Sequence, residues 1–224
     1  MAYKQDSEKI ITLENATKIY AGNTVLDGIS LSFVRGESVA FIGHNGCGKS
    51  TMLKVLAGLI SLSGGAVNYH QKLRFSYVPE KFPGMEIEML DYLNGIAAME
   101  GVDSGEVMHL INDFFLESMI HTRLDKLSKG SLQKVGVIQA IIKKHDVLLL
   151  DEPLSGQDTD SQEVFIAKIN ELRKQGVTVF MSCHEQRLVD ELSDKVYMID
   201  RGKLVEASAD VANDRPKVVG GSEV

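Results

Sequence analysis

A glycine-rich stretch, residues 43–50, carries the residue types that bind phosphate. Its sequence, GHNGCGKS, satisfies the pattern GxxxxGK[ST], in which backbone N–H groups and a helix N-terminus surround an anion. Lys49 is expected to place its ammonium group on the β- and γ-phosphates of a nucleotide, and the Ser50 hydroxyl to bind Mg²⁺. The residues that we expect to contact the nucleotide here are Gly43, His44, Asn45, Gly46, Cys47, Gly48, Lys49, Ser50 and Thr51. A glycine-rich turn that ends in lysine by chance is the alternative.

Two carboxylates follow the apolar segment 147–150, whose sequence is VLLL. In open α/β sheets ligands bind outside the carboxyl ends of the strands, so Asp151 and Glu152 are expected to face the phosphate loop. Asp151 is suited to bind Mg²⁺ through water, and Glu152 to polarise the attacking water as a general base. An acidic turn before Pro153 is the alternative.

Two further features point to phosphate. His184 follows the next expected strand, where its imidazole could bind the γ-phosphate and link it to the catalytic carboxylate, although a lone histidine is more often structural. Ser128 and Gly130 stand at the start of an expected helix, and a hydroxyl, a glycine backbone and a helix N-terminus make a second anion site. One ATP does not need two phosphate clamps from one chain, so we expect this site to close on an ATP held by another subunit. A helix cap alone would also explain Ser128.

Hydrophobic patterns predict the elements that position these side chains. Residues 38–42 read as a buried strand before the phosphate loop and residues 52–56 as a helix after it. Strand-like pieces separated by turn signals indicate an antiparallel lobe, at residues 10–13 and 29–34. From residue 147 strands and helices alternate, which is typical of a parallel sheet; the segments are 147–150, 160–174, 177–181, 186–192 and 196–199.

Between these parts, residues 85–145 show helical spacing of apolar residues, with Ser104 as a plausible helix cap. The predicted fold is therefore α/β: a P-loop NTPase core with a mostly parallel sheet flanked by helices, an N-terminal antiparallel β lobe and an inserted α-helical subdomain. The expected divisions are residues 1–84 for the lobe and first part of the core, 85–145 for the helical subdomain, 146–206 for the second part of the core, and 207–224 for a loose tail.

Composition excludes several classes of protein. Of the 224 residues, nine acidic and two basic ones between 85 and 126 account for the whole net charge of −7, which argues against nucleic-acid binding. The apolar stretches have only the length of strands, so no direct membrane span is expected, and the N-terminus lacks a secretory signal. These features predict a cytoplasmic protein. Cys47 and Cys183 are too few for a disulfide framework and are interpreted as buried thiols, with a redox role left open.

The order of the motifs resembles the ATP-binding subunit of ABC transporters. In that family GHNGCGKS looks like Walker A, LSKGS like the signature motif, VLLLDEP like Walker B, residues 155–158 like the D-loop, and His184 like the switch histidine. Tyr20 matches the aromatic residue that stacks on adenine, although it could equally pack within a strand. The resemblance covers residues 10 to about 206.

Two departures from the family pattern matter. The usual LSGGQ is LSKGS here, so Lys129 and Ser131 replace a glycine and a glutamine. The glutamine of the Q-loop, which approaches Mg²⁺ and senses the membrane partner, corresponds to Glu80, whose carboxylate accepts hydrogen bonds but cannot donate them as an amide does. Glu80 with LSKG resembles the ATPases of simpler exporters for antibiotics, bacteriocins or lantibiotics.

The resemblance implies an ATPase that uses ATP and Mg²⁺ to drive a separate transmembrane permease, and export is the expected direction of transport. It also implies head-to-tail dimerisation around two ATP molecules, with a second copy or a paralogous ATPase subunit, and a peripheral position at the inner face of the cell membrane. The helical insertion and the Glu80 loop would be the docking surface. Two alternatives remain open: a soluble ABC ATPase with a non-transport role, and a regulatory module that binds ATP but barely hydrolyses it.

Overall fold

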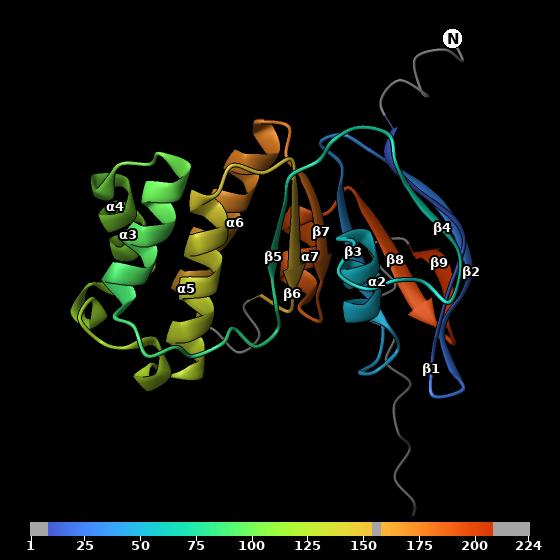
Figure 1. Ribbon diagram of the computed structural model, residues 1–224, viewed down its shortest axis with the longest axis horizontal. Coiled ribbons are helices and arrows are strands. Elements are labelled where there is room, and N and C mark those ends of the chain that lie inside the picture. The colour runs from blue at the N-terminus through green and yellow to red at the C-terminus, as the bar shows by residue number, and fades with distance from the viewer. Residues whose placement is uncertain (1–8, 154–157, 208–224) are drawn as a thin grey trace, which may run out of the picture.

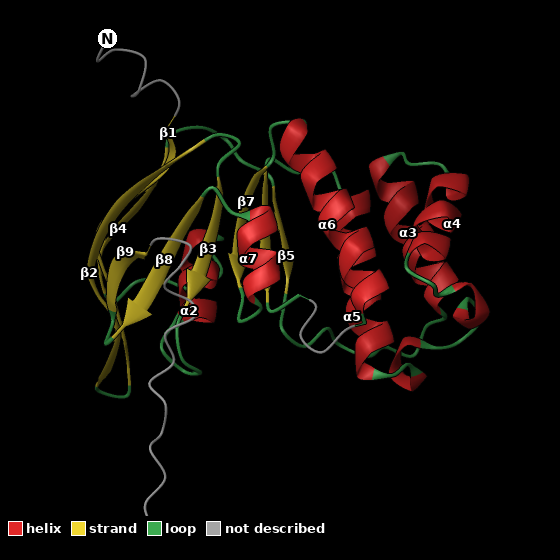
Figure 2. Ribbon diagram, turned by 180° about the vertical axis from the view of Figure 1, so that it is seen from behind, coloured by secondary structure: helices red, strands yellow, loops and turns green. Residues whose placement is uncertain are grey.

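The computed structural model describes residues 9–153 and 158–207, which form two β-sheets and a group of helices. Figures 1 and 2 show the smaller sheet at one end of the molecule, the larger sheet in the middle and a bundle of helices at the other end. The mixed α/β architecture predicted from the sequence is confirmed.

The smaller sheet is antiparallel. Its strands are β1 (Lys9–Tyr20), β2 (Asn23–Val34) and β4 (Gly64–Tyr69), in the spatial order β2-β1-β4. The turn between β1 and β2 is Ala21-Gly22, and both residues have positive φ, which suits the twist of a two-residue hairpin. The N-terminal antiparallel lobe is thus present, with β4 as an additional strand.

The larger sheet has the order β5-β6-β7-β3-β8-β9, and only β9 runs antiparallel to its neighbour. Its strands are β3 (Ser38–Ile42), β5 (Phe75–Val78), β6 (Val147–Asp151), β7 (Thr178–Ser182), β8 (Lys195–Asp200) and β9 (Lys203–Ala207). Every residue of β3, β6 and β7 is buried, because both faces of the sheet are covered. The expected loose tail began one residue too early, since Ala207 ends β9; residues 208–224 lie outside the described part.

Helix α2 (Lys49–Leu56) lies between the two sheets and joins them through an apolar core. Aromatic rings from several strands meet there: Phe33 of β2 lies edge-on to Phe180 of β7, with ring centroids 4.8 Å apart, and Phe41 stacks on Tyr197. Because α2 begins at Lys49, this core fixes the direction of the phosphate loop's helix.

The remaining helices pack on a second core. They are α3 (Met89–Glu100), α4 (Ser104–Asp113), α5 (Lys129–Ile142), α6 (Thr159–Lys174) and α7 (Gln186–Leu192), with single 3₁₀ turns at Glu117–Met119 and Leu124–Lys126. The expected cap of α4 was wrong by one residue: the side chain of Asp103, not Ser104, accepts the Gly105 N–H at 2.7 Å. None of the helices in residues 9–153 and 158–207 has both the length and the hydrophobicity to cross a bilayer.

Candidate functional site

The loop between β3 and α2 requires glycine for two different reasons. Gly43 has φ 140°, and a Cβ there would lie 2.7 Å from both the Cys47 Sγ and the Ile199 carbonyl oxygen, so no side chain fits. Gly46 has φ 80° but open space around it, so only its backbone conformation favours glycine. The glycines of the phosphate-loop pattern therefore have separate causes: close packing at Gly43, and an exposed residue with positive φ at Gly46.

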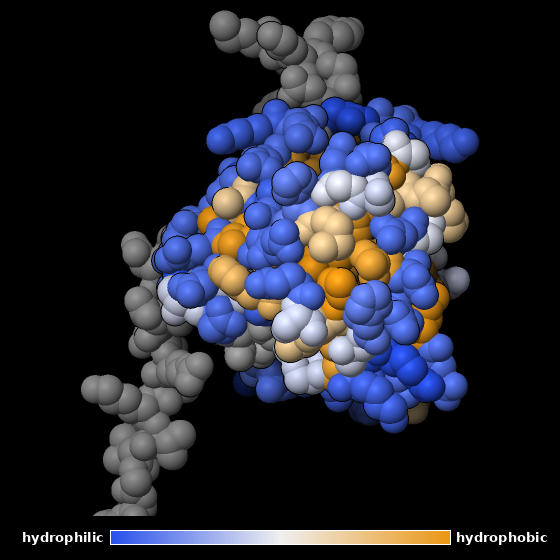
Figure 3. Space-filling model, turned by 90° about the vertical axis from the view of Figure 1, so that its left-hand side faces the viewer, coloured by the Kyte–Doolittle hydropathy of each residue, from blue (hydrophilic) through white to orange (hydrophobic). Residues whose placement is uncertain are grey.

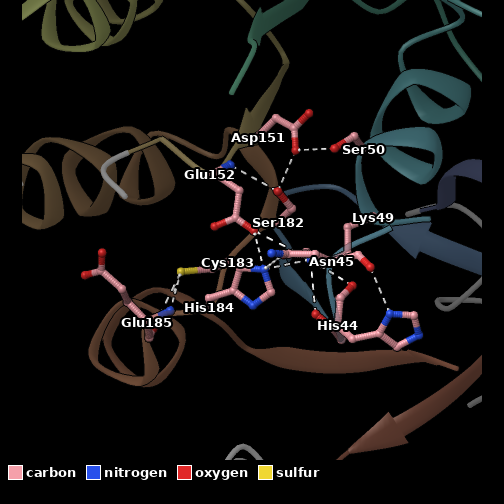
Figure 4. Close-up of polar contacts among 11 residues, drawn as sticks. His44, Asn45, Lys49, Ser50, Asp151, Glu152, Ser182, Cys183, His184 and Glu185 are labelled. Carbon is pink, nitrogen blue, oxygen red and sulfur yellow. Dashed lines mark hydrogen bonds and ion pairs between the residues drawn. The ribbon is translucent and has the colours of Figure 1, made fainter. Parts of the chain in front are cut away.

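Lys49 lies at the centre of a polar cluster (Figure 4). Its ammonium group is buried, donates to the Gly43 carbonyl at 3.1 Å, and lies 2.9 Å from the His184 Nε2 and 3.6 Å from the Glu152 Oε1. The same His184 nitrogen lies 2.9 Å from the Asn45 Oδ1 and 3.1 Å from the Glu152 Oε1. Side chains from three strand ends, predicted separately from the sequence, are thus brought within contact of one another.

The surroundings of the Glu152 carboxyl raise its affinity for a proton. Burial raises its pKa above the ordinary 4.5, an effect that the Lys49 charge partly opposes and the Asp151 charge reinforces. Its backbone is unusual for a residue other than glycine, with φ 48°, and strained backbone of this kind clusters at functional sites.

Asp151, at the end of β6, is 2% exposed and accepts three hydroxyl hydrogen bonds. Its Oδ1 accepts from Ser50 at 2.9 Å and from Ser182 at 2.7 Å, and its Oδ2 accepts from Tyr77 at 2.9 Å. A hydroxyl and a carboxylate side by side are oxygen ligands that suit Mg²⁺, which keeps several of its waters. The residues present therefore fit the metal that the sequence pattern implies.

A cavity of about 610 Å³ opens beside this cluster, within the range of small-molecule sites. It is lined by Asn45, Gly46, Lys49, Ser50, Glu80, Lys129, Gly130, Gln133, Glu152 and His184. Glu80 lies near enough to raise the pKa values of both Tyr77 and Glu152, although burial is the larger cause for each. Glu80 therefore lines the same cavity as Ser50 and Glu152, and its role as a metal ligand stays a prediction.

Of the two residues expected to bind an anion at the start of α5, only Gly130 lines the cavity. Ser128 caps the helix, since its Oγ accepts the Ser131 N–H at 3.1 Å, and it does not line the cavity. Lys129 and Gly130 do line it, together with the phosphate loop of the same chain. The contact of Ser128 and Gly130 with an ATP held by another subunit stays a prediction.

Tyr20 ends β1 and lies outside the cavity lining. The residue is 44% exposed, and the Lys18 ammonium group lies 4.9 Å from the ring centroid. Tyr20 pairs with Asn23 of β2 across the hairpin. Val25, also on β2, lies against the phosphate loop at Gly48. Tyr20 is therefore absent from the lining of the cavity, and its stacking on adenine stays a prediction.

The other loop residues have structural contacts. The Cys47 N–H donates to the carbonyl of His44, whose Nδ1 lies 2.9 Å from the Asn45 carbonyl. Thr51 is half-buried in the first turn of α2.

Both cysteines are buried. Burial raises the pKa of Cys47, and raises that of Cys183 to about 12, so both thiols are protonated at neutral pH. This agrees with buried, unreactive thiols.

Three residues near the site were missed by the sequence reasoning. Tyr77 and Ser182 bind Asp151, while Gln133 holds the Glu80 loop by donating to the Pro79 carbonyl at 2.9 Å and accepting from the Phe82 N–H. Ser182 is two residues before His184, and Tyr77 is three residues before Glu80. For these two residues, closeness in sequence to a predicted site residue was the signal that could have identified them.

The expected D-loop is only partly within the described residues, since 155–157 lie outside them. Asp158 caps α6 by accepting the Ser161 N–H at 2.8 Å, and this bond lowers its pKa. The Lys134 ammonium of α5 lies 3.6 Å from the Asp158 carboxylate and donates to the Phe114 carbonyl. Lys134 therefore links α5 to the start of α6.

Comparison with known sequences adds independent information. The family described as ABC transporter matches residues 26–155. An uncharacterised ABC transporter ATP-binding protein of Methanocaldococcus jannaschii is 33% identical over 201 residues, covering 87% of this chain and 76% of that protein. A zinc import ATP-binding protein, ZnuC of Pseudomonas fluorescens, is 32% identical over 199 residues, covering 87% of this chain and 75% of that protein.

Solved structures agree with the sequence matches. An ATP-binding subunit of an ABC transporter superposes with a TM-score of 0.78 at 25% identity, covering 90% of this chain and 91% of that one. RNase-L inhibitor superposes with a TM-score of 0.76 at 25% identity, covering 88% of this chain but only 38% of that one. The zinc importers among the relatives do not support the export direction expected from Glu80 and LSKG.

Proposed function

Because the chain belongs to the ABC transporter family as an ATP-binding subunit and ATPase, we propose that its hydrolysis of ATP moves a substrate through a separate membrane permease. The observation that carries this proposal is the meeting of Lys49, Glu152 and His184 beside a cavity that the phosphate loop also lines. Each of these side chains follows a different buried strand, so the sheet holds them at one edge.

In the proposed mechanism Lys49 and the loop N–H groups bind the phosphates and offset the charge that develops during attack. Glu152 orients the water and accepts its proton, which its raised pKa favours. His184 binds the γ-phosphate through the nitrogen that now contacts Lys49 and Glu152. Binding of ATP therefore replaces contacts within this cluster by contacts to phosphate.

We propose Ser50 and Asp151 as the groups that hold Mg²⁺, with Glu80 as a third candidate from the cavity wall. When bound, the metal would neutralise charge on the phosphate oxygens. The 2.9 Å contact between Ser50 and Asp151 supports the pairing of these two oxygens.

We also propose that two copies, or this chain and a paralogous subunit, close around two ATP molecules. Lys129 and Gly130 already face a cavity with phosphate-binding groups, and their backbone at the start of α5 can offer N–H groups to an anion. ATP affinity and dimer closure would then be linked thermodynamically.

The permease is proposed to dock on the helical part and the Glu80 loop. Figure 3, which faces the helical end of the molecule, shows apolar side chains gathered among charged ones. Ile87, Met99 and Phe115 in this part are exposed.

Two experiments test the partner and the direction of transport. Purification of the native complex, followed by identification of its membrane subunit, tests whether a permease binds the chain. Comparison of substrate uptake with efflux in reconstituted vesicles tests the direction. A pure ATPase without any membrane partner would favour the non-transport alternative.

The decisive experiment on the site compares Glu152→Gln with Glu163→Gln, which changes an exposed carboxylate on α6. Glu152→Gln should remove most ATP turnover, by 10²-fold or more, while ATP binding persists, since a general base contributes roughly 10²–10⁴-fold. Glu163→Gln should leave both unchanged. Turnover by Glu152→Gln equal to that of Glu163→Gln would rule out the assigned base.

A further inference from the structure

We propose that Ser182 and Tyr77 are positioning residues that fix the Asp151 carboxylate for the metal, and that Ser182 also sets the backbone of Glu152. The inference rests on the proposed function, in which Asp151 binds Mg²⁺. It assigns a role to two residues that no motif identifies.

The sheet order places these residues on both sides of Asp151. Strand β6 lies between β5 and β7, and Asp151 stands directly opposite Ser182 in the register of β6 and β7. Tyr77 reaches Asp151 from the other neighbouring strand, where it pairs with Leu149. The two hydroxyls therefore approach the carboxylate from opposite flanks.

Each hydroxyl holds a different oxygen of the carboxylate. Ser182 Oγ donates to the Oδ1 at 2.7 Å, and the Tyr77 phenol donates to the Oδ2 at 2.9 Å. Ser50 also donates to the Oδ1, but it is itself assigned to the metal. With both oxygens tied by neighbouring strands, the carboxylate cannot rotate about its side-chain bond, which is how outer groups orient a metal ligand.

Ser182 also holds the next residue. The Glu152 N–H, in a backbone with φ 48°, points to the Ser182 Oγ at 3.0 Å and to the Ser182 carbonyl at 3.2 Å. A left-handed conformation at a residue with a side chain persists only where its surroundings over-determine it. One buried serine thus connects the carboxylate that binds the metal with the backbone of the proposed base.

The directions of the hydrogen bonds agree with this arrangement, since the Tyr77 phenol donates to the Asp151 Oδ2. Ser182 is fully buried, and its hydroxyl proton is directed to Asp151 while its oxygen accepts from Glu152.

The test compares Ser182→Ala and Tyr77→Phe with two matched controls. Ser76→Ala removes a buried hydroxyl that has no partner among the described residues, one position from Tyr77. Tyr69→Phe removes a phenol that donates to the Leu56 carbonyl, away from the site. Ser182→Thr keeps the hydroxyl.

Two affinities are measured for each variant: that for a fluorescent ATP analogue in the presence of a chelator, and that of the nucleotide complex for Mn²⁺, followed by electron paramagnetic resonance. Ser182→Ala and Tyr77→Phe should each weaken Mn²⁺ binding about tenfold, the lower end of the range for lost outer contacts, with metal-free nucleotide affinity unchanged. The controls should match the wild type, and Ser182→Thr should restore the affinity for Mn²⁺.

The proposal is overturned if Ser182→Ala and Tyr77→Phe bind Mn²⁺ as tightly as Ser76→Ala and Tyr69→Phe do. An equal loss of metal-free nucleotide affinity would indicate a general structural effect and would also overturn it. Failure of the proposed function would give a different result. The nucleotide complex of the wild-type protein itself would then bind no Mn²⁺, and its affinity for ATP would not depend on the metal.

Discussion

Alanine substitutions at three glycines test how closely the phosphate loop is packed. Gly43→Ala adds a methyl group where the Cys47 Sγ and the Ile199 carbonyl would each lie 2.7 Å away, at a φ of 140°. Gly46→Ala adds the same group at a φ of 80° with nothing within 4 Å. Gly95→Ala is the reference, since Gly95 lies in the exposed middle of α3 with open space around it.

The expected free energies of unfolding follow from these environments. Backbone strain at a positive φ costs about 1–3 kcal/mol, and an overpacked side chain about 1–3 kcal/mol more. Alanine regains roughly 0.4–1 kcal/mol by restricting the unfolded chain. Gly43→Ala should therefore destabilise by about 1–6 kcal/mol and Gly46→Ala by about 0–3 kcal/mol, with Gly43→Ala the more costly because of its overpacking. Gly95→Ala should stabilise by about 0.5–1 kcal/mol.

Equilibrium unfolding in urea, followed by far-UV circular dichroism, measures the series, because the chain has no tryptophan for fluorescence. ATP binding supplies a second reading. Gly46→Ala should weaken ATP binding more than its small loss of stability would suggest, because its methyl group enters the space that the phosphates need. If Gly43→Ala costs no more than Gly46→Ala, the close approach of Cys47 and Ile199 to Gly43 is wrong.

Two further predictions concern protonation and helix capping. Since Glu152 must be ionised to accept a proton and burial raises its pKa, kcat/KM should fall with decreasing pH already above pH 4.5; a pH profile that is flat down to 4.5 would contradict the assignment. Asp103→Ala should destabilise the protein by about 1 kcal/mol through loss of the α4 cap, while Ser104→Ala should have almost no effect; urea unfolding that reverses this order would restore the cap predicted from the sequence.

Local sequence was sufficient wherever a short segment has only one way to fold. The apolar runs at 38–42 and 147–150 form buried strands, and the glycine pattern between residues 43 and 48 requires a loop with left-handed residues. Because ligand-binding residues of parallel sheets follow the strands, Lys49, Glu152 and His184 could be assigned to one edge before any geometry was known.

The remaining features depend on contacts between distant segments. Asp103 and Ser104 are adjacent, and both can cap a helix, so only the observed hydrogen bond distinguishes them. The third strand of the antiparallel sheet, β4, has little hydrophobic alternation and is defined by its pairing with β1. Tyr77 and Ser182 carry no motif, since their roles arise from the order of strands in the sheet.

The sequence by itself determined the chemistry: a phosphate loop, two carboxylates after a buried strand and a histidine after the next, in an order that identifies an ABC-type ATPase. Only the tertiary structure decided that Ser182 and Tyr77 flank Asp151, that Ser128 is engaged as a helix cap, and that Lys129 shares a cavity with Lys49. The physical reason is that motifs record local backbone and residue type, whereas hydrogen bonds between strands depend on which strands the whole chain places side by side.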